Sequence, residues 1–329
     1  MDEISKIPAA PSPERPERGL LWVFVGKNGI RTGWGILLFI VIFAAAVFGI
    51  GFFFQNFFHR SGHAGALMPS AALAGEGLQL LSVIIATGAM ALIERKSMLA
   101  YGYQGKARAT RFFSGLIWGF IAISAMLFAL WQLGFLAFDG RGLHGAEIWK
   151  YAAVWGLVFL GAGVFEESLL RGYLQYTMTR GVGFWWGALV FSVLFGLGHT
   201  LNPGESPVGL FSAGAFGLVC CLSLWYTGSL WWAVGFHAAW DWGESYFYGT
   251  SDSGLVSQGH LFGEHPLGKI LWSGGKTGPE GSLLVLLLLG IVAILMWLWW
   301  GRRVESPFKG QGWRPAWSRK ARVVEGEGF

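Results

Sequence analysis

The chain has 329 residues, of which 53% are hydrophobic and only 13% are charged, and its mean hydropathy is +0.49. Soluble domains carry about 25% charged residues, so this composition excludes an ordinary water-soluble protein and indicates an integral membrane protein. The net charge is +5, but no basic module interleaved with aromatic residues points to a nucleic-acid partner.

Runs of about 18 or more mostly apolar residues predict transmembrane helices. Eight such runs follow one another along the chain, at residues 33–58, 73–94, 112–138, 148–178, 184–200, 208–226, 229–248 and 281–300. The sequence therefore predicts an all-α fold, a polytopic membrane bundle of about eight helices around a polar cavity. We expect a weakly ordered N-terminal segment (1–30), a single membrane domain (31–300) and a basic tail (301–329).

Basic residues gather before the first run, between the second and third, and after the last. In an eight-span chain these three segments share one side, which the positive-inside rule makes cytoplasmic. Both termini are therefore expected in the cytoplasm, and the short loops suit a bacterial inner membrane. The glycine-rich loop at about 249–280 is then expected outside, where it can cover the bundle.

The fourth run is too long for one straight span, and the Gly-Ala-Gly at 161–163 is the expected place for a kink. Small residues allow membrane helices to approach closely, so the glycines of the fifth and sixth runs predict tight packing there. Cys220 and Cys221 are neighbours in the sixth run, cannot easily bridge each other, and are interpreted as small core residues.

Ionisable residues at bilayer depth are costly and mark functional sites, and here nearly all of them fall between residues 148 and 248. On the fourth run, Glu167 and Arg171 have the i,i+4 spacing of a helical ion pair with the acid first. Glu166 is offset from its neighbour by about 100°. This geometry predicts that Arg171 holds Glu167 while Glu166 faces something else. The alternative is that both glutamates share the arginine.

The fifth and seventh runs carry two histidines and a second acidic pair. Phe195 and His199 lie one turn apart at the end of the fifth run, where His199 is either a catalytic group or an interfacial cap. His237 and Asp241 lie one turn apart on the seventh run, and Glu244 continues their stripe. The pair is either functional or a mutually satisfied structural pair.

Side chains of this kind from three helices can form an inward-facing site in a bundle. A glutamate that deprotonates water, with imidazoles that orient the water and stabilise an oxyanion, suffices for amide hydrolysis without a covalent intermediate. The same atoms can instead hold a divalent metal such as zinc.

Three motifs stand in order on successive hydrophobic segments: Glu166-Glu167-x-x-x-Arg171, Phe195-x-x-x-His199 and His237-x-x-x-Asp241. Together they resemble the motifs of the CAAX protease and bacteriocin-processing enzyme family of intramembrane proteases, over about residues 150–248. The resemblance implies an eight-helix fold with a conical water-filled cavity. It also implies hydrolysis of a peptide bond in a membrane-anchored or hydrophobic substrate.

Carried over by position, the resemblance implies that Glu166 activates the water with His199, while His237 and Asp241 stabilise the oxyanion. Eukaryotic members have Asn where this chain has Asp241, and an ionised Asp cannot donate a hydrogen bond. Asp241 is then protonated, orients His237 or binds metal. We favour a mechanism without a metal or other cofactor, because the chain has no His-Glu-x-x-His motif. If zinc is bound, the expected ligands are these same four residues.

Two other function classes stay open. A proton- or ion-coupled transporter would show inverted repeats and broken helices at matching positions, and no such symmetry is seen in the sequence. A catalytically silent, immunity-type binding protein would pack Glu166 against Arg171 with no cavity beside it.

The depth of His199 in the membrane is a further question, since His199 lies near a helix end whereas Glu166 and His237 lie mid-span. Convergence requires a tilt, a kink near 196–198 or different span limits.

Overall fold

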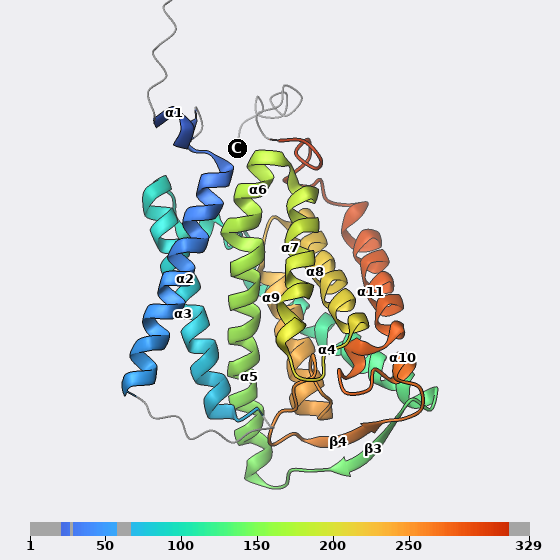
Figure 1. Ribbon diagram of the computed structural model, residues 1–329. Helices are drawn as coiled ribbons and strands as arrows, with labels where there is room; N and C mark the ends of the chain where they lie inside the picture. Colours follow the sequence, from blue (N-terminus) through green and yellow to red (C-terminus); the bar gives the residue numbers. More distant parts are fainter. Residues whose placement is uncertain (1–20, 27–28, 58–66, 316–329) are drawn as a thin grey trace, which may run out of the picture.

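The computed structural model describes residues 21–26, 29–57 and 67–315, which form the helical bundle of Figure 1. This confirms the predicted polytopic helical fold. In this part of the chain seven helices are long and apolar enough to cross a membrane. They are α2 (Thr32–Phe57), α3 (Pro69–Glu94), α4 (Arg108–Gln132), α5 with η2 and α6 (Ala146–Glu167, Ser168–Leu174, Gln175–Val182), α7 with η3 (Phe184–Gly198, His199–Leu201), α8 (Pro207–Thr227), and α11 with η6 (Leu283–Met296, Trp297–Gly301).

The eighth predicted span, 229–248, is α9 (Trp231–Asp241) followed by the π-helical η4 (Trp242–Tyr248). It is not among the seven apolar helices, and every residue from 232 to 241 is buried. α9 packs against α4, α5 and α8, and Gly115 and Gly119 of α4 meet its backbone, where a Cβ atom would clash. Because protein surrounds α9, it can carry polar residues that a lipid-facing helix cannot.

The long α5–η2–α6 helix does deviate from regular geometry, but not at residues 161–163, where the kink was expected. α5 runs regularly through this stretch, and Gly163 serves close packing, since a Cβ there would lie 3.2 Å from the Val234 carbonyl of α9. The irregular turn is η2, in which Gly172 has non-helical angles (φ −78°, ψ −115°). The helix therefore changes course immediately after Glu166 and Glu167.

The third predicted span, 112–138, extends too far, because α4 ends at Gln132 and the chain then forms strand β3 (Leu136–Arg141). Gly134 adopts a positive φ of 75°, and the Phe135 amide donates to the Leu130 carbonyl, a glycine-based helix stop. β3 pairs antiparallel with β4 (Phe262–Pro266), from Leu136 opposite Pro266 to Arg141 opposite Phe262. The predicted outer loop is thus partly ordered by this pair.

The two described ends of the chain lie at the same end of the bundle, opposite β3 and β4 (Figure 1). At this end are α1 (Leu21–Phe24) and the small pair β1 (Val25–Gly26) and β2 (Gly29–Ile30). Residues 302–315 pack on the start of α7, where the Phe184 amide donates to the Gln311 carbonyl at 2.8 Å. The remainder of the expected flexible termini, 1–20, 27–28 and 316–329, lies outside the described residues.

The shorter remaining elements lie in the connections. They are η1 (Met98–Ala100), α10 (Ile270–Ser273) and η5 (Pro279–Gly281). The segment 249–282, which contains β4, α10 and η5, packs over the α7–α8 turn, since Thr277 Oγ1 donates to the Gly204 carbonyl at 2.9 Å. This segment therefore covers the bundle, as its position in the sequence allowed.

Candidate active site

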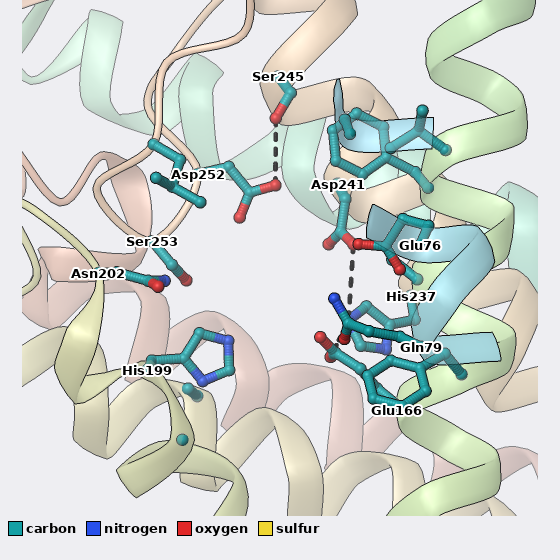
Figure 2. A pocket seen from close by; sticks show the side chains of 18 of the residues that line it. Glu76, Gln79, Glu166, His199, Asn202, His237, Asp241, Ser245, Asp252 and Ser253 are labelled. Carbon is teal, nitrogen blue, oxygen red and sulfur yellow. Dashed lines mark hydrogen bonds and ion pairs between the residues drawn. The ribbon is translucent and has the colours of Figure 1, made fainter. Parts of the chain in front are cut away.

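A cavity of about 620 Å³ opens into the bundle between α3, α5, α7, α8 and α9, with one wall supplied by the 249–282 segment. Figure 2 shows its polar side chains in two groups that face each other. One group contains Glu76, Gln79, Glu166, His237 and Asp241, and the other contains His199, Asn202, Asp252 and Ser253. The cavity brings together all four predicted catalytic residues, with His237 beside Glu166 and Asp241 and with His199 on the opposite wall.

His237 is the centre of the first group. Its Nε2 lies 3.4 Å from Glu166 Oε2 and 3.5 Å from Asp241 Oδ2, and its Nδ1 lies 3.2 Å from Glu167 Oε1. A carboxylate can only accept, so Nδ1 donates to Glu167. With Glu167 on one ring nitrogen and two carboxylates beside the other, the orientation of the ring is fixed, and Nε2 is the atom presented to Glu166 and Asp241.

Glu166 and Glu167 occupy different environments, as their angular offset predicts. The Glu167 and Arg171 side chains are both fully buried, and Arg171 Nη1 donates to Glu167 Oε1 at 3.1 Å. The guanidinium lies over the Phe195 ring, 4.6 Å from its centroid. The Glu166 side chain is 28% exposed and faces the cavity. Of the two adjacent glutamates, Glu167 is thus buried in the interior, whereas Glu166 is accessible to a ligand.

His199 approaches from the opposite wall of the cavity (Figure 2). Its Nδ1 is 2.8 Å from the Phe195 carbonyl, which only accepts, so Nδ1 carries a proton and the neutral ring keeps Nε2 free as an acceptor. It lies in the short η3 turn that follows the 15 residues of α7, and from there it lines the cavity.

Sequence reasoning missed the contribution of α3. Glu76 and Gln79 line the cavity beside Glu166 and Asp241 (Figure 2), and Glu76 Oε2 is buried without a hydrogen-bond partner. A signal was available, because Glu76 is an acid well inside a mostly apolar span. The 249–282 segment also contributes Asp252, whose pKa is raised to about 7, first by burial and then by the Glu280 carboxylate.

The predicted zinc ligands are Glu166, His199, His237 and Asp241. A zinc ion needs three or four donors about 2.0–2.3 Å from one point. No three of these four side chains have donor atoms within 4.8 Å of one another among the described residues. His199 lies on the far wall. The arrangement does not form a zinc site, and the chemistry proposed below is derived from the side chains alone.

Part of the chain matches a protein-family model. Residues 147–243, from α5 to the start of η4, match the model of type II CAAX prenyl endopeptidases, described as Rce1-like. A search of curated proteins finds no match. The matched segment contains every residue of the three motifs, so the predicted resemblance is confirmed there. Residues 147–243 are therefore similar to type II CAAX prenyl endopeptidases over less than a third of the chain, and this supports, at the level of the family, an intramembrane endopeptidase.

Proposed function

We propose that this protein hydrolyses a peptide bond of a membrane-associated protein or peptide, using a water molecule that Glu166 activates. The observation that supports this most directly is the meeting of Glu166, His237 and Asp241 on one wall of a 620 Å³ cavity, with His199 on the other. Acid, imidazole and space for a substrate are combined inside a membrane bundle. Peptide hydrolysis by activated water requires this combination.

Glu166 is the general base. Its carboxylate reaches the cavity and is not paired with Arg171, which is held by Glu167. It takes a proton from the water as the hydroxyl attacks the peptide carbonyl, and returns that proton to the leaving amine. A base in this position contributes about 10²- to 10⁴-fold to the rate. The free Nε2 of His199 accepts the second hydrogen of the same water from the opposite wall.

His237 stabilises the oxyanion. Glu167 fixes Nδ1, so the ring cannot turn, and a protonated Nε2 donates to the oxygen that becomes negative. Of the three roles open to Asp241, orientation of His237 is the one its position favours, because Oδ2 lies 3.5 Å from Nε2. An ionised Asp241 supports a donor on His237 without donating itself.

The remaining partners follow from composition and family. The seven apolar helices require a lipid bilayer, and a substrate anchored in that bilayer reaches the cavity without leaving it. The basic segments at the described chain ends lie at one end of the bundle (Figure 1), which the positive-inside rule assigns to the cytoplasm. We place the protein in a bacterial inner membrane with both termini cytoplasmic.

A silent binding protein is less well supported. That hypothesis predicts Glu166 packed against Arg171 without a cavity, whereas Glu166 lines the cavity and its recorded partner is His237 Nε2. The position of Glu166 on the cavity wall therefore favours the hydrolase over the silent form in which Arg171 holds Glu166.

The test is cleavage by the purified protein in proteoliposomes that contain a peptide with one membrane anchor. Mass spectrometry identifies the new termini. Glu166→Gln should abolish cleavage, whereas Glu147→Gln, on the exposed first turn of the same helix, should not change it. Full cleavage by Glu166→Gln would refute the assigned role. Proton flux through the vesicles without any cleavage would favour the transporter instead.

A further inference from the structure

Three carboxylates that the proposed mechanism does not use come together beside the cavity. Glu244 belongs to η4, directly after the helix that carries His237 and Asp241, and Asp252 and Glu280 belong to the covering segment 249–282. One oxygen of each lies within 4.8 Å of the others. Residues distant in sequence thus direct three negative groups at one point.

Glu244 is the least satisfied member of this carboxylate cluster. Its side chain is 0% exposed, and neither carboxylate oxygen has a hydrogen-bond partner. The nearby indole of Trp240 donates to Glu280 Oε1 at 3.2 Å instead. Apart from this nearby indole, an ionised Glu244 has no donor and a protonated Glu244 has no acceptor among the described side chains. A buried carboxylate without hydrogen-bond partners costs free energy unless a further group binds its oxygens.

Among the described residues, no lysine or arginine side chain serves this purpose. No lysine or arginine within residues 21–26, 29–57 and 67–315 forms an ion pair with any member of the carboxylate cluster. Ser245 donates to Asp252 at 3.1 Å, and Ser253 and the Trp240 indole donate to Glu280, so the hydrogen-bond donors to these two acids are neutral. Three carboxylates gathered in one buried to half-buried place repel each other, and a bound cation removes that repulsion.

We propose that a hard divalent cation, calcium or magnesium, binds between Glu244, Asp252 and Glu280 and tethers the 249–282 segment to η4. An all-oxygen set of carboxylates suits these ions and disfavours zinc, which prefers nitrogen and sulfur. Oxygens around one calcium ion lie at most about 5 Å apart, as these do. Asp252 and Glu280 also line the cavity, which provides the entry path.

The proposed ion holds the wall of the cavity and touches none of the groups assigned to peptide hydrolysis. The proposal does not depend on the proposed function, because cation binding is measured without any substrate. A protein that binds calcium at this point and cleaves nothing would refute the peptidase and leave the cation site intact.

The experiment uses terbium, a hard ion whose luminescence is sensitised by a tryptophan close to it. The full-length protein in detergent is stripped with chelator and titrated with Tb³⁺ under tryptophan excitation. We expect a saturable signal that calcium or magnesium displaces. Glu244→Gln should weaken binding at least ~10-fold, whereas Glu264→Gln, on β4 and outside the carboxylate cluster, should bind like wild type.

Trp240→Phe provides a second variant in case Glu244→Gln does not fold. It keeps all three carboxylates but removes the indole next to Glu280, so the luminescence should fall while calcium still raises the thermal unfolding temperature. The proposal is overturned if no saturable binding occurs, if Glu244→Gln binds as tightly as wild type, or if only zinc displaces terbium.

Discussion

The ion pair between Glu167 and Arg171 should be the most sensitive polar contact of the bundle. Both side chains are fully buried and their charged atoms are 3.1 Å apart, which corresponds to about 5 kcal/mol of attraction at an effective dielectric constant of about 20. Arg171→Met removes the guanidinium from the Glu167 carboxylate, which keeps the contact with His237 Nδ1 at 3.2 Å. Because an unpaired buried charge remains, we expect a loss of about 3–5 kcal/mol in unfolding free energy.

The double variant Glu167→Gln/Arg171→Met removes both charges and should recover most of this loss, since a neutral pair carries no desolvation penalty. The assay is unfolding by sodium dodecyl sulfate in mixed micelles, followed by tryptophan fluorescence. Lys309→Met is the matched control. Lys309 and its i,i+4 partner Glu305 are both 66% exposed, so Lys309→Met should lower the unfolding free energy by only about 0–1 kcal/mol. If Arg171→Met costs no more than Lys309→Met, or if the double variant is the least stable, the buried pair does not organise this site.

Two further predictions concern packing and pH. A Cβ at Gly217 would clash with Arg171 Nη2, so Gly217→Ala should displace the guanidinium and reduce peptide cleavage. A Cβ at Gly290 meets nothing within 4 Å, so Gly290→Ala should have no effect. Cleavage rates and melting temperatures of the two variants check this, and equal cleavage rates would contradict it. Burial, and then the Asp139 carboxylate, raise the pKa of Glu264 on β4 to about 7. Since the folded state then binds the proton more tightly than the unfolded state, stability should fall as the pH rises from about 4.5 to 7. Melting temperatures of wild type and Glu264→Gln should diverge over this window, and parallel curves would refute the shift.

Contacts one helical turn apart could be predicted from the sequence, because α-helical geometry alone determines them. The Glu167–Arg171 ion pair and the approach of His237 to Asp241 both follow from i,i+4 spacing. The different environments of Glu166 and Glu167 also follow, since adjacent residues on a helix point in different directions.

Contacts between distant segments could not be predicted in this way. Glu76 reaches the cavity from a helix about 90 residues earlier, and hydropathy does not say which face of a span is inward. For a related reason, the sequence does not show whether a glycine within a span permits close packing or marks an irregular turn. Gly163 permits close packing against α9, and the irregular turn lies at Gly172, yet both are glycines within one apolar run.

Strand β3 was missed because apolar residues continue past the end of α4, and a hydropathy window does not separate a lipid-facing helix from a short strand. The predicted fifth span, 184–200, agrees with α7 and η3, which end at Leu201, but these limits alone do not show that His199 faces the cavity.

The central claim is that the carboxylate of Glu166 supplies the base for peptide hydrolysis, and chemical rescue tests it most directly. The cavity beside Glu166 has room for a small acid once the side chain is truncated. Cleavage of the anchored peptide by Glu166→Ala should be about 10²- to 10⁴-fold slower than by wild type, and added formate should raise it in proportion to its concentration. Formate should not rescue Glu167→Ala, whose carboxylate is structural. Wild-type cleavage by Glu166→Ala without formate would contradict the account.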